Sequence, residues 1–231
     1  MGTLLAVLLY YARVWLELAV DILHGRFALV RLLVVATIPA VIAALLFDDL
    51  ISGPLREPLS IAAALVVGSG VFILAERGAT PRTPAATTAA TAAATTAATT
   101  RTPPATTADA AAIGVAQALA LIPGMSRSGL TISMGLARGL PRAEATRLSF
   151  LLSTPAVAGA GLRTLLDLRR SSAIFEHPDA LAVGFVVSFV TGIAAIAFLV
   201  RFLRGHSLAW FVPYRLALAG VIVAAAAMGA L

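Results

Sequence analysis

Long apolar stretches separated by short polar segments dominate this chain. Five of them approach the ~20 residues that an α-helix needs to cross a ~30 Å hydrocarbon core. They cover residues 28–47, 57–75, 144–162, 181–200 and 210–231. Another apolar segment, at the start, ends in Tyr11, Arg13 and Trp15, a pattern typical of a membrane interface. Because only about a dozen residues precede this pattern, roughly 18 Å of helix, we expect a first spanning helix that lacks its beginning.

Residues 109–140 are also apolar, but a break divides them into two pieces that are too short to span. The first piece, residues 110–122, makes about 20 Å of helix, and the second, residues 130–140, makes about 16 Å. Pro123 and Gly124 interrupt the run, and polar residues follow. We therefore predict a re-entrant hairpin of two half-helices that enters and leaves on one side. Irregular backbone at that depth must be buried in protein or line a watery cavity.

Composition excludes a water-soluble globule and changes what the positive net charge implies. The chain is 60% hydrophobic and 12% charged, whereas soluble domains are about 25% charged. All 17 basic residues are arginine and the net charge is +6, but these arginines lie between apolar spans, as the positive-inside rule describes. A nucleic-acid surface would need a clustered basic patch with aromatic platforms, so we expect no nucleic-acid partner. The absence of cysteine excludes disulfides and thiolate metal sites.

The arginines also predict a topology. They gather in four segments that we place in the cytoplasm, near residues 13–31, 77–101, 138–147 and 201–204. The 48–56 loop, the 163–180 loop and the C-terminus then lie outside. The alanine-, threonine- and proline-rich residues 76–108 contain almost no large side chain to bury, and we interpret them as a disordered cytoplasmic loop.

These patterns predict one all-α, multi-pass membrane domain over residues 1–231, with about six transmembrane helices and the re-entrant hairpin. Three helices on each side of the low-complexity loop and hairpin suggest an inverted repeat, as in many transport folds. The predicted parts are first-repeat helices in 1–75, the low-complexity loop 76–108, the hairpin 109–140 and second-repeat helices in 142–231.

The turn of the hairpin, residues 123–131, carries the candidate chemistry. A helix N-terminus there would present unpaired N–H groups and a dipole that favours an anion such as phosphate. An arginine near the bilayer centre costs about 2.5–3.5 kcal/mol even on a lenient scale, so Arg127 is a functional candidate unless it merely pairs with another helix. Its planar fork matches phosphate oxygens. The predicted phosphate-binding residues are Gly124, Ser126, Arg127, Ser128, Gly129 and Thr131, of which Ser128 and Thr131 could equally be helix caps.

At this turn the sequence resembles the undecaprenyl-diphosphate phosphatases of bacterial membranes. Residues 123–131 meet the family pattern P-G-x-S-R-S-G-x-T in full. The resemblance continues through QALALIPGMSRSG, RLSFLLSTPAVAGA, RFLRGHSL and PYRLALAG, and, before the low-complexity loop, through GTLLAVLLYYARVW, ATIPAVIAALLFDDL and ALVVGSGVFILAER. It implies a multi-pass protein of the bacterial plasma membrane that hydrolyses undecaprenyl diphosphate, recycles the carrier lipid for cell-wall synthesis and gives bacitracin resistance. Among its residues, Ser126 and Arg127 would be catalytic.

One part of the family pattern does not occur in these 231 residues. The family's first re-entrant loop carries an acidic motif, E/Q-x-x-x-E, and then P-x-S-S-x-G-H, which supply acid/base and metal-associated functions. The resemblance implies a divalent cation, magnesium or calcium, for which this chain offers no identifiable ligands. Gln117 takes the corresponding place in the second repeat but cannot act as a base. We therefore expect this chain by itself to bind the lipid diphosphate and to hydrolyse it slowly or not at all.

The remaining ionisable residues suggest no replacement for that motif. The three histidines are expected in solvated loops or at the inner boundary, and Glu144 in the first turn of a helix; they are His24, His177, His206 and Glu144. The alternatives to an enzyme are an inactive homologue that binds lipid diphosphates and a transporter-like membrane protein. Membrane lipids are expected partners, and the sequence leaves a homo-oligomer open.

Overall fold

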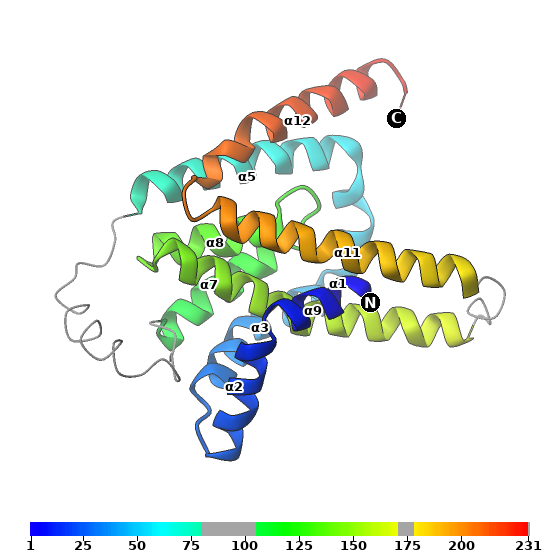
Figure 1. Cartoon of the computed structure of the whole chain (residues 1–231). Helices are drawn as coiled ribbons and strands as arrows, with labels where there is room; N and C mark the ends of the chain where they lie inside the picture. The colour runs from blue at the N-terminus through cyan, green and yellow to red at the C-terminus, as the bar shows by residue number, and fades with distance from the viewer. Residues whose placement is uncertain (80–104, 171–177, 231) are drawn as a thin grey trace.

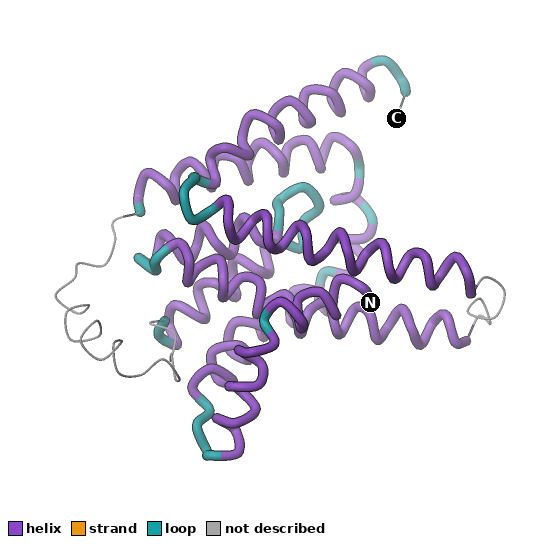
Figure 2. The backbone as a smooth tube through the Cα atoms, viewed as in Figure 1, coloured by secondary structure: helices purple, strands orange, loops and turns teal. Residues whose placement is uncertain are grey.

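The computed structural model of the chain describes residues 1–79, 105–170 and 178–230, and every regular element in these ranges is a helix (Figures 1 and 2). This confirms the predicted all-α class. Most of the predicted low-complexity loop, residues 80–104, lies outside the described residues. His177 lies outside them as well.

Residues 1–79 form six short and long helices. They are α1 (Gly2–Tyr10), α2 (Ala12–Leu23), α3 (Ala28–Leu46), α4 (Asp48–Ser52), the 3₁₀ turn η1 (Pro54–Arg56) and α5 (Pro58–Gly78). The first two are bent by 74° at their junction, and Tyr11, at that junction, is buried against Phe150. The helix predicted before the interfacial pattern is therefore α1, and the residues of that pattern lie at the bend and in α2.

The described residues from 105 onward contain the hairpin, three longer helices and a 3₁₀ turn. They are α7 (Thr107–Leu119), α8 (Arg127–Ala137), α9 (Arg142–Arg170), α11 (Pro178–Phe202), the 3₁₀ turn η3 (Leu208–Phe211) and α12 (Val212–Ala227). The two half-helices that the sequence predicts are thus present, as α7 and α8. By length and composition four described helices can cross a membrane, or five when the bent pair counts as one span. The total of about six spans stays a prediction.

Local sequence explains where the hairpin helices begin. The Thr106 hydroxyl accepts from the backbone N–H of Asp109, and the Asp109 carboxylate accepts from the backbone N–H of Thr106, which is a complete capping box. Ser126 caps α8 with a single bond, in which its hydroxyl accepts from the backbone N–H of Gly129. The first cap starts α7 before the predicted apolar piece 110–122, and the second starts α8 within the turn where a helix N-terminus is predicted.

The hairpin lies inside the bundle. Helix α7 packs along α3, and α8 packs between α5 and α9, as Figure 1 shows. Ile113 on α7, Ile132 on α8 and Leu152 on α9 are completely buried in the shared core. The turn between α7 and α8 is therefore carried by two helices that each bury one face in the shared core, while Val115 and Leu119 on α7 stay exposed.

Ion pairs join the two ends of the hairpin, opposite its turn. Asp109, at the start of α7 and fully buried, accepts from Nε of Arg138, at the end of α8, at 2.8 Å. Nearby in the chain, both oxygens of Glu76 accept from Arg142 at 2.7 Å, and Glu76 also accepts from the backbone N–H of Leu208. The chain thus enters and leaves the hairpin at one end, where α5, α9 and the loop after α11 also meet. This agrees with the predicted grouping of these loops, whose side of the membrane stays a prediction.

Candidate anion-binding site

The turn that joins α7 to α8 fits tightly against α5. Gly124 has a positive φ of 95°, and a Cβ atom at this position would lie 2.7 Å from the carbonyl oxygen of Ile61. At Gly129, on the first turn of α8, a Cβ atom would lie 2.0 Å from Cζ of Phe72. Both glycines among the predicted phosphate-binding residues therefore permit close approach to the protein's own α5. Approach of a phosphate to the same backbone stays a prediction.

Ser126 occupies the N-cap of α8 in a strained conformation. Its φ of 72° makes it the one non-glycine residue with positive φ in the described part of the chain. Such conformations cost about 1–3 kcal/mol and persist where the surroundings enforce them, often at functional sites. Here the strain turns the chain sharply, so that α8 begins directly after the turn with its N-terminus at the hairpin tip.

Unpaired donors collect at this N-terminus. The Ser126 hydroxyl accepts a hydrogen bond from the N–H of Gly129, and the Ser126 carbonyl accepts one from the N–H of Leu130. The backbone N–H groups of Ser126, Arg127 and Ser128 form no hydrogen bond to any residue that the structure describes. Because the helix dipole adds positive potential at the same point, these three donors are suited to an anion.

Arg127, the first residue of α8, adds a full positive charge beside these donors. Arg127 is exposed, and its guanidinium makes no hydrogen bond or ion pair with the described residues. By contrast, Arg138 and Arg142 are both paired with carboxylates. The alternative that Arg127 serves only to pair with another helix finds no partner among the described side chains, so its fork remains available for a ligand.

The two hydroxyls that the sequence left ambiguous behave differently. Thr131 is 1% exposed, and its Oγ1 lies 2.9 Å from the carbonyl oxygen of Arg127 and 2.7 Å from Oγ of Ser149 on α9. Its hydroxyl is therefore used inside the protein, and its role as a phosphate ligand stays a prediction. Ser128 is half-buried, and its hydroxyl makes no hydrogen bond within the described ranges.

The structure adds one residue that the sequence analysis did not single out. Arg215, on the first turn of α12, is 6% exposed and donates from Nη2 to the carbonyl oxygen of Gly124 at 2.8 Å. The signal was present in the sequence, since an arginine inside the apolar stretch 210–231 is costly and hence a candidate. Nothing in the local pattern, however, indicates that it reaches a turn 91 residues away.

The described residues contain no group of three or more histidine, aspartate or glutamate side chains that could hold a metal ion. The more buried carboxylates are paired instead, Asp109 with Arg138, Glu76 with Arg142 and Glu144 with Arg147. Glu144 lies in the first turn of α9, as predicted, and the histidines at positions 24 and 206 are exposed, also as predicted. The divalent cation that the resemblance implies thus finds no ligand set in this part of the chain.

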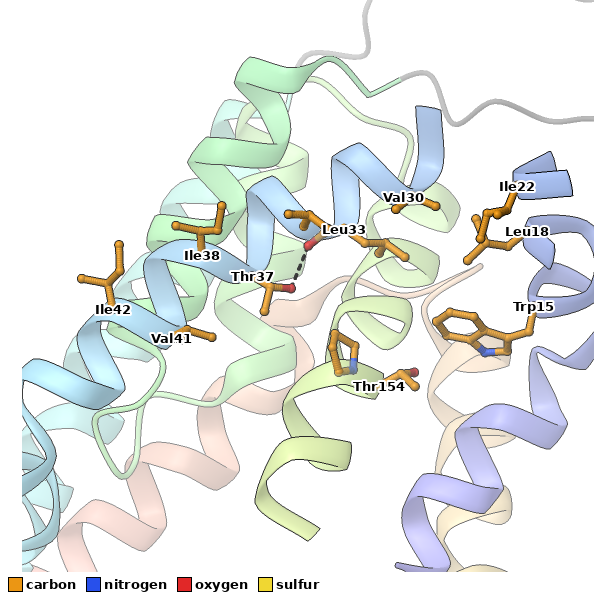
Figure 3. A pocket seen from close by; sticks show the side chains of 12 residues that line it. Trp15, Leu18, Ile22, Val30, Leu33, Thr37, Ile38, Val41, Ile42 and Thr154 are labelled. Atoms are coloured by element: carbon orange, nitrogen blue, oxygen red, sulfur yellow. Dashed lines mark hydrogen bonds between the residues drawn. The ribbon is translucent and has the colours of Figure 1, made fainter. Parts of the chain in front are cut away.

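A separate groove between α2, α3 and α9 is apolar (Figure 3). Its volume is about 530 Å³. The indole N–H of Trp15 and the hydroxyl of Thr154 line it without a hydrogen-bond partner, whereas Thr37 donates to the carbonyl of Leu33. Because its lining contains no charged side chain, this groove offers a phosphate no ion pair.

The helices and the turn define a class: a multi-pass α-helical membrane protein with a cationic, donor-rich turn inside its bundle. Comparison with known proteins gives the family. The chain belongs to the family described as "Bacitracin resistance protein BacA", which it matches over residues 1–221.

Curated relatives agree with the family match. The chain is 38% identical to an "Undecaprenyl-diphosphatase" of Desulforudis audaxviator, over 96% of this chain and 79% of the relative. It is 40% identical to one of Corynebacterium efficiens, over 96% of this chain and 73% of the relative. It is also 38% identical to one of Mycobacterium marinum, over 99% of this chain and 79% of the relative. The resemblance predicted from the hairpin motif is thereby confirmed.

Proposed function

We propose that this protein is a multi-pass phosphatase of the bacterial plasma membrane that hydrolyses undecaprenyl diphosphate to undecaprenyl phosphate and inorganic phosphate. This reaction returns the carrier lipid to cell-wall synthesis and gives resistance to bacitracin. One observation carries the proposal beyond the family match: Arg127 stands unpaired among the described residues, beside three unpaired backbone donors at the start of α8.

This arrangement suits the charge of the reaction. Water attacks the terminal phosphorus, the bond from that phosphorus to the bridging oxygen breaks, and the bridging oxygen leaves on the lipid monophosphate. Negative charge shifts toward the bridging and terminal oxygens as this happens. Donors fixed before the reaction stabilise such charge without reorganising, and a guanidinium fork can hold two oxygens at once. In the proposal Ser126 and Arg127 act on the reacting phosphate, and Gly124, Ser128, Gly129 and Thr131 complete its binding site.

The proposal assigns no base and no metal ligand to this chain. General acid/base catalysis typically contributes 10²- to 10⁴-fold, and the resemblance places those groups, with the magnesium or calcium ion, in a motif that these 231 residues do not contain. The expected turnover is therefore slow. The assay must be sensitive enough to follow a single turnover with protein in excess of lipid and with the divalent ion supplied.

The test compares three purified proteins in detergent: the chain as it is, Arg127→Lys and Arg204→Lys. The Arg204 side chain is exposed and makes no hydrogen bond or ion pair with the described residues, so it is a matched control. Phosphate release should be at least about tenfold slower in Arg127→Lys, because a point charge does not reproduce a bidentate contact, and unchanged in Arg204→Lys.

Two results would contradict the proposal. Equal release by Arg127→Lys and the unchanged chain would remove Arg127 from the reaction. Tight binding of undecaprenyl diphosphate with no phosphate release from the unchanged chain would make it a lipid-diphosphate-binding protein instead of a phosphatase.

A further inference from the structure

Arg215 connects three separate segments through one edge of its guanidinium. Its Nε donates to Oγ of Ser69 at 3.0 Å, and its Nη2 donates to the carbonyl oxygens of Leu65 at 3.2 Å and Gly124 at 2.8 Å. Ser69 in turn donates to Leu65 at 2.7 Å. The arginine on α12 therefore binds α5 and the hairpin turn at the same time.

The surroundings are shaped to admit this side chain. A Cβ atom on Gly68 would lie 2.5 Å from Nη2 of Arg215 and 3.0 Å from the carbonyl oxygen of Met125. The guanidinium carbon lies 4.8 Å from the centre of the Phe72 ring, in cation–π contact. That ring also meets Gly129 on α8. Glycine and phenylalanine on α5 thus fix the arginine on one side and the start of α8 on the other.

The location of Arg215 makes its positive charge energetically unfavourable. The residue is buried, it lies in the first turn of α12, where the helix dipole disfavours a cation, and no carboxylate of the described residues pairs with it. A buried guanidinium is tolerated when its N–H groups find acceptors, and here the Ser69 hydroxyl accepts from Nε and two backbone carbonyls accept from Nη2. Two of its three acceptors, Ser69 and Leu65, would suffice to join α12 to α5, whereas the third belongs to the turn that precedes Ser126 and Arg127.

We propose that Arg215 is a positioning residue: by holding the Gly124 carbonyl against α5, it sets the place of the turn from which Arg127 and the free N–H groups reach the diphosphate. It acts through the turn and does not touch the substrate. A displacement of about 1 Å at a reacting group can cost 10²-fold in rate. This inference rests on the proposed phosphatase function.

The competing account is that Arg215 only joins α5 to α12. Ser69→Ala separates the two accounts, because it removes the acceptor of Nε on α5 and leaves the bond to Gly124 in place. We expect Ser69→Ala to retain phosphate release within about threefold, and Arg215→Gln to lose at least about tenfold. Arg215→Lys should recover only part of this loss, because one ammonium cannot reproduce the planar fork.

A double-mutant cycle tests whether Arg215 acts through the turn. Residues that share one mechanism show non-additive effects. Arg215→Gln should therefore slow phosphate release by less than about threefold when Arg127 is already lysine. Equal losses in both backgrounds, or an equal loss from Ser69→Ala and Arg215→Gln, would overturn the proposal.

A second measurement does not depend on catalysis. The chain contains no cysteine, so a single nitroxide can be attached at Ile122→Cys in the turn or, as a control, at Val221→Cys farther along α12. Arg215→Gln should increase the mobility of the label in the turn and leave the control label unchanged. If the label in the turn keeps the same mobility in Arg215→Gln, the positioning role is contradicted, whether or not the protein releases phosphate. A failure of the unsubstituted protein to release phosphate would count against the phosphatase proposal alone.

Discussion

Replacing Gly129 with alanine should destabilise the protein, although the same change normally favours a helix. Gly129 lies in the first turn of α8, and an added Cβ would come within 2.0 Å of Cζ and 2.5 Å of Cε1 of Phe72. Real contacts of this kind do not occur, so the ring or the helix must move. Phe72 is 2% exposed and packs against the guanidinium of Arg215, which leaves the ring no free space.

Opposing magnitudes decide the sign of this change. Alanine is favoured over glycine in a helix interior by about 1 kcal/mol, and less in a first turn. An added methyl group in a closely packed site costs about 1–3 kcal/mol, occasionally more, and a contact this short belongs at the upper end. We therefore expect a net loss of about 1–2 kcal/mol, which corresponds to a fall of roughly 2–8 °C in Tm for a chain of this size.

Thermal unfolding in detergent, followed by circular dichroism, measures this loss. Gly70→Ala, in the middle of α5, is the matched control, because a Cβ at this position meets nothing within 4 Å. That variant should unfold at the same temperature or higher. A Gly129→Ala protein at least as stable as the unchanged chain would refute the reasoning, and it would mean that α8 does not pack on Phe72 as closely as described.

Further predictions concern buried hydroxyls and topology. Thr131→Val should lower the unfolding temperature because it removes the bond to Ser149, whereas Thr154→Val should leave it unchanged or raise it, because the Thr154 hydroxyl lines the apolar groove without a partner; equal shifts would contradict the assigned bonding. Single cysteines between residues 85 and 105 should be labelled from the cytoplasm, and one at Leu231 from outside. Labelling of both from the same side would contradict the predicted inverted repeat.

The sequence predicts the hairpin well because its signals are local. Two apolar pieces too short to span, with Pro123 and Gly124 between them, require a break, and the structure has one. The motif at this break also identifies the family, since residues 123–131 meet its nine-residue pattern in full. The start of α8 within this motif is also predicted, whereas α7 begins before its predicted apolar piece because Thr106 caps it.

Contacts between distant segments lie beyond such reasoning. In the sequence Arg215 is one more arginine near the start of an apolar stretch, and only the packing of α12 along α5 brings it to Gly124. Likewise, Thr131 fits the phosphate motif in sequence, but the packing of α8 on α9 commits its hydroxyl to Ser149. The bend at Tyr11 has no proline or glycine to signal it.

Equilibrium binding of undecaprenyl diphosphate tests the central claim most directly, because it probes the anion site without depending on catalysis. The measurement compares the unchanged chain with Arg127→Gln and with Arg204→Gln as the control. A hydrogen bond to a charged group is worth about 1.5–3 kcal/mol, so Arg127→Gln should raise Kd at least about tenfold, while Arg204→Gln should leave it unchanged. An unaltered Kd in Arg127→Gln would contradict the account and would place the diphosphate elsewhere in the protein.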